Sequence, residues 1–255
     1  MKWMRLVGVF ALFFLIQRIS LAQSCIDPDL DRILETKRGL YIGELHGSNE
    51  MPDYFLCLVD YFVQINKKQK IVVSLELPES AREPSAVFWR NQDGRASQRM
   101  YALVQTLLER ERRDILILHF QYKDIEVLEQ GKQGRTPDQR IYDALNMVQE
   151  KGFVLALGGN IHNMKTLPVA MTSSVVTAGM MLGDTWVSVR LAATNPGEVW
   201  ACSPNRPCGL ISILPSKMAN FNLGRLNRDQ NQHHDFIWFL PSLTPSRPVY
   251  EVITH

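Results

Sequence analysis

Two segments of the sequence share a glycine followed three positions later by a histidine. They are Gly43-Glu44-Leu45-His46 and Gly159-Asn160-Ile161-His162, and each follows or ends a short apolar run. The imidazole of histidine is a base and a metal ligand near neutral pH, and glycine lets the chain turn sharply beside a ligand. The repeated pattern therefore predicts one polar site built around His46 and His162.

Further polar side chains stand at the ends of the other apolar runs. Because ligands of parallel α/β sheets gather at the carboxyl ends of the strands, we expect these side chains at one edge. Glu76 lies among apolar neighbours, where a carboxylate needs either a functional role or a partner such as arginine. His119 could instead be satisfied by the backbone. In chain order the candidates are Glu44, His46, Glu50, Glu76, His119, Asn160 and His162.

The motifs that the sequence lacks narrow the chemistry. There is no Gly-x-Ser-x-Gly nucleophile elbow, no phosphate-binding P-loop and no His-Glu-x-x-His zinc helix. Water could then be activated for hydrolysis directly, with His46 or Glu44 as general base. A divalent metal ion (Mn, Co or Zn) could also activate it. The candidate metal ligands are His46, His162, Glu44 and Glu76. Two outcomes without turnover stay open: haem binding, because histidines also hold haem iron, and a non-catalytic interaction domain.

A second candidate metal site is the segment His233-His234-Asp235. Adjacent residues of an extended chain point to opposite faces. The two histidines are therefore not expected to bind one ion.

Apolar runs alternate with helical patterns through the first two thirds of the chain. This alternation is typical of an α/β fold, a mainly parallel sheet flanked by helices. Thr136 is expected to cap the third helix, with Pro137 at its first position, and Ser48 or Asn49 to cap the first helix. The predicted strands are 40–43, 70–77, 114–120 and 153–157, and the predicted helices are 55–63, 96–113 and 136–150.

The last third of the chain has a different pattern. Residues 185–191 alternate between apolar and polar, and 236–240 and 249–253 also read as strands. We expect these strands to be an antiparallel extension of the same sheet. No repeat or linker requires a second domain, so residues 23–255 are predicted to form a single α/β domain.

The first 22 residues have the pattern of a secretory signal peptide. Lys2 and Arg5 precede an apolar run at 7–16, and Ser20-Leu21-Ala22 offers a cleavage site before Gln23. Ten apolar residues are too few to span a bilayer, which takes roughly 20. An uncleaved anchor is the alternative. Cleavage predicts a periplasmic or secreted protein.

Removal of this segment changes the charge of the protein. It holds three of the 28 basic residues and no acid, which leaves 25 basic against 26 acidic residues and a net charge of −1. A nearly neutral chain has no basic field for nucleic acid. We therefore expect a small-molecule or peptide substrate, and no membrane span after cleavage.

Four cysteines follow the signal segment, and an even number in an exported chain favours disulfides. Of three pairings we favour Cys202–Cys208, because the turn-rich residues between them close a short loop, and this leaves Cys25–Cys57. Metal binding or nucleophilic catalysis by a cysteine is the alternative. Ala22-Gln23-Ser24 is a poor match to a lipoprotein box, which argues against a lipidated Cys25.

The order of the two Gly-x-x-His segments, within an α/β pattern over residues 38–166, resembles a known superfamily. It joins the erythromycin-esterase-like proteins, the ChaN-like haem-binding lipoproteins and the Tiki/TraB proteins. The helix before the second segment is also similar and singles out Arg140, which either reaches the strand edge or stays solvated. The resemblance implies a shared α/β fold. It also implies a site of Glu44, His46, Glu76, Arg140 and His162.

The resemblance implies several activities rather than one. Erythromycin-esterase-like members are hydrolases, Tiki-like members are metal-dependent proteases, and ChaN-like members bind haem in iron uptake. The chain lacks the lipoprotein box of ChaN and the membrane anchor of Tiki, and its last third matches no family. The leading hypothesis is an exported hydrolase of ester or peptide bonds, with a metal ion as its expected cofactor. The alternative is a haem- or metal-binding protein of iron uptake.

Overall fold

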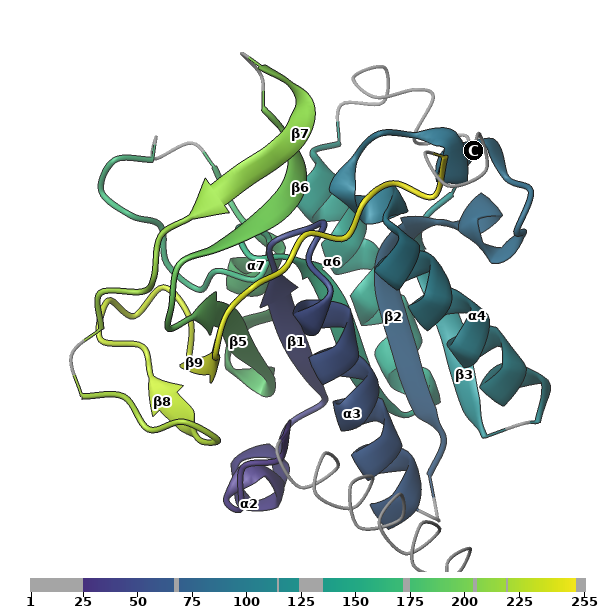
Figure 1. Ribbon diagram of the computed structural model, residues 1–255. Coiled ribbons are helices and arrows are strands. Elements are labelled where there is room, and N and C mark those ends of the chain that lie inside the picture. The colour runs from purple at the N-terminus through teal and green to yellow at the C-terminus, as the bar shows by residue number, and fades with distance from the viewer. Residues whose placement is uncertain are drawn as a thin grey trace, which may run out of the picture.

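The computed structural model describes residues 25–66, 69–113, 115–123, 135–171, 175–203, 206–218 and 220–250. Its strands are β1 (Gly39–Glu44), β2 (Ile71–Pro78), β3 (Leu116–Tyr122), β4 (Phe153–Gly159), β5 (Trp186–Ala193), β6 (Gly197–Ser203), β7 (Arg206–Ile213), β8 (Leu226–Arg228) and β9 (Phe236–Leu240). Seven of them form one sheet in the order β3-β2-β4-β1-β5-β9-β8 (Figure 1). All neighbouring strands are parallel except β8 and β9. The predicted α/β class is confirmed.

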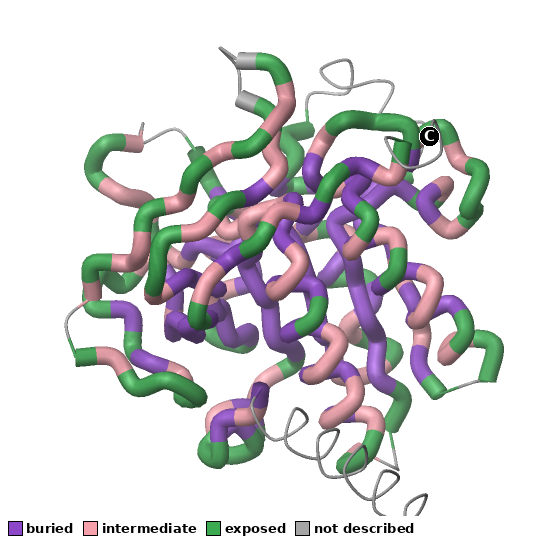
Figure 2. Tube along the Cα trace, viewed as in Figure 1, coloured by how far each residue is buried: buried purple, intermediate pink, exposed green. Residues whose placement is uncertain are grey.

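The centre of the sheet is buried on both faces, as its continuous apolar sequence requires. Every residue of β1 and β2 is buried, and the strands form the interior of the molecule in Figure 2. All four predicted strands of the first two thirds exist. The third begins and ends two residues later than expected, and this later end changes which side chain it brings to the edge of the sheet.

Helices cover both faces of the sheet. In Figure 1, α3 (Glu50–Ile65) and α4 (Gln98–Arg112) lie in front of the sheet. Leucine and phenylalanine side chains of these two helices join the apolar faces of β1 and β2 in one core cluster. On the opposite face, α6 (Pro137–Val148) and α7 (Ala178–Leu182) pack against the sheet in a second cluster. The shorter elements are α2 (Leu30–Leu34), η2 (Glu79–Arg82), η3 (Val87–Arg90), η4 (Gly94–Ala96), η5 (Gln149–Lys151) and η6 (Gly183–Thr185).

One of the two predicted helix caps is confirmed. Thr136 accepts from the backbone of Gln139, whose side chain accepts from the backbone of Thr136, a complete capping box with Pro137 in the first turn. The prediction for α3 was wrong. Asn49 occupies the N-cap position but makes no side-chain cap. Its amide donates to Thr244 Oγ1 instead, and the hydroxyl of Ser48 has no hydrogen-bond partner among the described residues.

The last third of the chain extends the sheet differently from the prediction. Strands β5 and β9 exist but pair in parallel with the sheet, and only the short β8 is antiparallel to its neighbour. The prediction of an antiparallel extension was therefore wrong for the two longer strands. Strands β6 and β7 form a separate antiparallel hairpin, which stands beyond the carboxyl end of β1 (Figure 1).

The strand predicted at 249–253 is absent from its described part, residues 249–250, and the rest lies outside the described residues. Instead, residues 243–250 cross the loops at the carboxyl edge of the sheet. Pro245 and Pro248 form isolated bridges to Ser48 and Ser97. Proline has no backbone N–H and so interrupts the regular ladder that a strand needs. The segment works as a strap across two loops.

Both predicted disulfides are present, Cys25–Cys57 and Cys202–Cys208. All four cysteines are therefore cross-links, as is usual in proteins of oxidising compartments. The signal segment 1–22 lies outside the described residues. In the part of the chain that is described, no helix is long and apolar enough to cross a membrane.

Candidate functional site

His46 lies in the loop that follows β1 and is held by the last residue of that strand. Its ring Nδ1 is 3.0 Å from Glu44 Oε1, and because a carboxylate only accepts, the ring donates. Burial lowers the pKa of His46, but the hydrogen bond and the negative charge of Glu44 outweigh it, so the pKa is raised. The other Glu44 oxygen, Oε2, is buried without a hydrogen-bond partner among the described residues. The charge of Glu44 is thus directed at His46.

His162 follows β4 and is held in the same way by a different element. Its Nδ1 donates to Asp138 Oδ1 over 2.9 Å. Asp138 lies in the first turn of α6 and also accepts from the backbone N–H of Ala178 at the start of α7. Burial lowers the pKa of His162, and the hydrogen bond to Asp138 together with the charges of Glu76 and Asp138 raises it overall.

Glu76 of β2 lies near both imidazoles, and its negative charge raises the pKa of each. Its Oε1 is 3.7 Å from His162 Nε2, and its Oε2 accepts from the backbone N–H of Gly159 over 2.6 Å. A Cβ atom at Gly159 would lie 3.3 Å from His46 Nε2 and 3.6 Å from Glu76 Oε2. Nε2 of His46 and Oε2 of Glu76 therefore both border the space beside Gly159, and a side chain at 159 would crowd that space.

A cavity of about 200 Å³ opens beside Glu76 and His162. Its polar wall also includes Tyr122, the last residue of β3, whose hydroxyl donates to Glu76 Oε1 over 3.4 Å. Arg95 of η4 reaches the same oxygen at 3.7 Å. Arg140 of α6 is buried at the cavity and also donates to a backbone carbonyl of the preceding loop. The guanidinium groups of Arg95 and Arg140 therefore line the same cavity as the carboxylate of Glu76.

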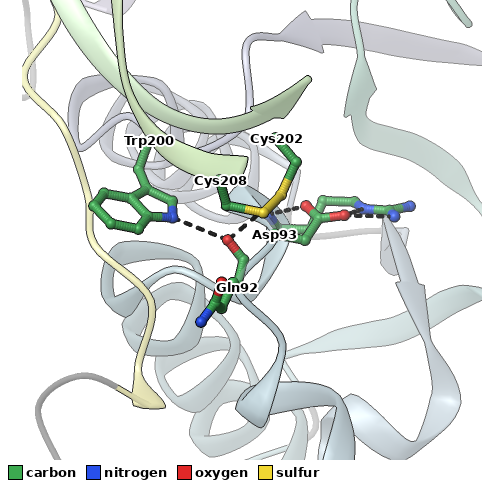
Figure 3. Close-up of a disulfide and its surroundings, with 6 residues drawn as sticks. Gln92, Asp93, Trp200, Cys202 and Cys208 are labelled. Carbon is green, nitrogen blue, oxygen red and sulfur yellow. Dashed lines mark hydrogen bonds and ion pairs between the residues drawn. A yellow bond between two sulfur atoms is a disulfide. The ribbon is translucent and has the colours of Figure 1, made fainter. Parts of the chain in front are cut away.

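The hairpin β6–β7 holds the loop that carries Arg95. The backbone carbonyl of Gln92 accepts from the indole N–H of Trp200 over 2.9 Å and lies 3.7 Å from Sγ of the disulfide-bonded Cys202 (Figure 3). The next residue, Asp93, accepts from the guanidinium of Arg95 at 2.7 and 3.1 Å. The disulfide-closed hairpin thus fixes the loop from which a cation reaches Glu76.

Two of the predicted strand-end residues do not lie in this site. Because β3 continues to Tyr122, His119 lies in mid-strand, hydrogen-bonded to Ser74 Oγ, and burial lowers its pKa to about 4. His119 is therefore a neutral imidazole, and its hydrogen bond to Ser74 joins two neighbouring strands. Glu50 lies in the first turn of α3 and accepts from the backbone and hydroxyl of Thr244, so it holds the strap.

The pair His233-His234 is split, as expected for adjacent residues. His234 is buried, and its Nε2 donates to the backbone carbonyl of Asn160 over 3.0 Å, which supports the second Gly-x-x-His turn. His233 bonds Thr166 at the surface. Asn160 therefore contributes its backbone carbonyl to the support of this turn.

Three residues of the site were missed by sequence reasoning. Arg95 lies in a segment that reads only as a polar loop, Tyr122 lies beyond the expected end of its strand, and Asp138 looked like an ordinary first-turn acid of a helix. Only Asp138 had a signal in the sequence, because Thr136-Pro137-Asp138 fixes the start of α6 ahead of β4. That position aims the acid at the carboxyl edge of the sheet.

The side chains present do not fit the expected metal ion. Glu44 is bonded to Nδ1 of His46, away from the Nε2 atom of that ring, and Arg95 already supplies a cation to Glu76. Among the described residues no three His, Cys, Asp or Glu side chains are grouped as metal ligands would be. Haem fits no better, because a cavity of about 200 Å³ is smaller than the roughly 300–1,000 Å³ of pockets for drug-sized ligands.

Known proteins share this fold without close sequence similarity. No family model and no curated protein matches the chain. A solved Bacillus cereus protein is similar over 87% of this chain and 92% of its own, with 12% identity and a TM-score of 0.61. A mutant of the erythromycin esterase EreC in its open conformation is similar over 91% and 98%, with 11% identity and a TM-score of 0.52. ChaN of Campylobacter jejuni, solved with cofacially bound haem, has 11% identity over 82% and 90% and a TM-score of 0.37. The chain therefore shares the α/β fold of the Bacillus cereus protein and of EreC, as the resemblance predicted.

Proposed function

We propose that this protein is an exported hydrolase of ester or peptide bonds that activates water with histidine and glutamate side chains, without a metal ion. One observation carries the proposal. Two imidazoles, each held at Nδ1 by a carboxylate, lie near the charge of Glu76, and Glu76 and His162 line a cavity together with two arginines. General acid–base catalysis needs a histidine whose ring is held in a fixed orientation, and a carboxylate at Nδ1 provides this.

His46 is assigned as the general base. Its carboxylate partner is buried and, within the described residues, the second oxygen of Glu44 has no other hydrogen bond, so the full charge favours proton uptake at His46. His46 Nε2 takes a proton from water as the water oxygen attacks the carbonyl carbon. The side chain is 26% exposed, which admits water to the ring.

His162 is assigned as the general acid. It lines the cavity and lies near the negative charge of Glu76, which favours its protonated form. Its proton passes to the leaving oxygen or nitrogen as the bond to the carbonyl carbon breaks. Arg95 and Arg140 line the same cavity and would stabilise the negative charge that develops on the carbonyl oxygen.

The test is a panel of chromogenic esters and amides assayed with wild type, His46→Ala and His162→Ala. We expect each variant to lose roughly 10²–10⁴-fold in kcat/KM, the usual contribution of a general acid or base. His233→Ala, which removes a surface histidine bonded to Thr166, is the matched control and should keep full activity. Wild-type rates in both site variants would overturn the proposal.

Two further arms separate the alternatives. Activity should survive dialysis against a chelator, whereas loss on chelation and recovery with Mn, Co or Zn would favour metal-assisted hydrolysis by the same residues. A Soret shift on haem titration that His46→Ala abolishes, with no hydrolysis of any substrate, would favour the haem-binding alternative.

A further inference from the structure

A second, larger cavity lies at the same edge of the sheet. It encloses about 450 Å³ at the carboxyl half of β5, beside the start of β9 and under the segment that leaves β7. Part of its wall is apolar, with Leu45, Ile213 and Met218 among the side chains. The charged groups of its wall are Arg190, Lys217 and Asp229. Nothing in the proposed chemistry uses these residues.

Arg190 is the unusual member of this wall. It lies on β5, and its Nε is buried without a hydrogen-bond partner among the described residues. A buried donor of a charged group that lacks an acceptor costs more than a neutral one. A guanidinium in this position therefore favours a ligand that brings an acceptor with negative charge.

The wall carries two cations and one anion, so its charge is positive overall. Both oxygens of Asp229 already accept from backbone N–H groups, those of Asn231 at 3.0 Å and His234 at 2.9 Å. Lys217 is exposed at the rim and adds a second positive charge. Burial, with the nearby charge of Arg190, lowers the pKa of His234, so this histidine is neutral at pH 7 and neither adds to nor offsets the charge.

The strand register places this cavity beside the proposed catalytic site. Gly158 of β4, Gly43 of β1 and Arg190 of β5 are neighbours across three adjacent strands. Two strand spacings correspond to about 10 Å. Leu45, which lines the second cavity, directly precedes His46. One small molecule could therefore reach both places.

We propose that the cavity lined by Arg190 and Lys217 binds a carboxylate or phosphate group of the substrate, while the bond to be cleaved lies between His46 and His162. The apolar part of the wall suits a short hydrocarbon segment between the two groups. That the anion belongs to the substrate rests on the proposed hydrolase function. The anion site itself rests on Arg190 and the cavity alone.

The experiment is titration calorimetry with two probes, inorganic phosphate and the dicarboxylate adipate, on wild type, Arg190→Met and His162→Ala. Wild type should bind at least one probe, and which one binds tells phosphate from carboxylate. Arg190→Met should weaken that binding at least tenfold, whereas His162→Ala should bind as wild type does. Arg32→Gln is the matched control, because Arg32 is a solvent-exposed arginine with a side chain 74% exposed.

Folding is followed in the same samples. Methionine has a similar length and no charge, so Arg190→Met should melt at or above the wild-type temperature without anion and should lose the stabilisation that the anion gives wild type. If this variant does not fold, Lys217→Gln at the exposed rim replaces it. The proposal is overturned if neither probe binds, or if Arg32→Gln weakens binding as much as the cavity variant.

The two proposals fail separately. Hydrolysis of neutral esters without any Arg190-dependent binding would remove the anion site and keep the hydrolase. Arg190-dependent binding without hydrolysis of any ester or amide would keep the anion site and remove the hydrolase. With both present, wild type should hydrolyse a 4-nitrophenyl monoester of adipate at least tenfold faster, in kcat/KM, than 4-nitrophenyl butyrate, and Arg190→Met should reduce that ratio.

Discussion

His46 and His162 are each held at Nδ1 by a carboxylate, but the two carboxylates come from different parts of the chain. The acid that holds His46 is Glu44, two residues earlier on the same strand end, whereas the acid that holds His162 is Asp138, 24 residues earlier on a helix. Among the described residues the side chain of Glu44 has no other hydrogen bond, whereas Asp138 also joins α6 to α7. Equivalent orientation of two imidazoles therefore arises once from local sequence and once from tertiary packing.

The largest effect is expected at Glu76, whose negative charge raises the pKa of both histidines. Glu76→Gln keeps an acceptor for the Gly159 N–H but removes the charge that holds a proton on His162 and faces Arg95. We expect kcat/KM to fall about 10³-fold, within the range for loss of acid–base function. Glu79→Gln, on the exposed turn that follows the same strand, should have no effect. An unchanged rate in Glu76→Gln would mean that the two histidines work independently.

The next effect compares the two acids directly. Glu44→Gln and Asp138→Asn keep a hydrogen-bond acceptor for Nδ1 but remove its charge. We expect each to lower kcat/KM roughly 10–100-fold, as loss of a group that orients a functional histidine does. Equal losses would support equivalent roles for the two pairs. A loss in only one variant would show that the other histidine is structural.

The pH dependence should separate the base from the acid. The pKa values of both histidines are raised above the ordinary value near 6.5, by their carboxylate partners against the effect of burial. The rate should rise with pH as His46 loses its proton and fall at higher pH as His162 loses its proton. Both limbs of this pH–rate profile should lie at higher pH than for histidines of ordinary pKa. Glu44→Gln should move the lower limb to lower pH, and Asp138→Asn the upper one. If each variant moves the opposite limb, the two roles are exchanged.

The stability of the protein should fall over the pH range in which the activity rises through loss of the proton on His46. A histidine whose pKa is raised on folding stabilises the protein below its unfolded pKa, and this contribution is lost as pH rises through the folded pKa. The free energy of unfolding from denaturant titrations should therefore fall from pH 6 upward, less so in Glu44→Gln/Asp138→Asn. An equal fall in the double variant would assign the effect to other groups.

The smallest effect is expected from Gly159→Ala. The added methyl would lie 3.3 Å from His46 Nε2 and 3.4 Å from His162 Cδ2, so the rings must move by a few tenths of an ångström. We expect a loss of about three- to tenfold in kcat/KM, since small displacements of catalytic groups are costly. Gly209→Ala, where nothing lies within 4 Å of the added atom, is the control. A full rate in Gly159→Ala would show that the rings do not close on this space.

The difference between the two pairs also explains what the sequence could predict. An apolar run and the polar residues that follow it are neighbours in the sequence. The sequence could therefore predict four strands, and it could predict that Glu44, His46, Glu76 and His162 lie at the carboxyl edge of the sheet. Tyr122 was missed because the end of a strand depends on the length of its neighbour, not on its own composition. Asp138 and Arg95 reach the site from a helix and a loop, and only packing brings them there. The parallel pairing of β5 and β9 likewise depends on crossover connections that no local pattern marks.

The strap at 243–250 has a consequence for the order in which the site is completed. Ser246 donates to the carbonyl of Gly47, and Val249 to that of Ala96, so the strap ties the loop of His46 to the turn that carries Arg95. These residues follow every strand of the sheet in the chain. The sheet can therefore form before its loops are fastened, and a proteolytic cut between Leu240 and Leu243 would leave a folded core in which the loops of His46 and Arg95 are released together.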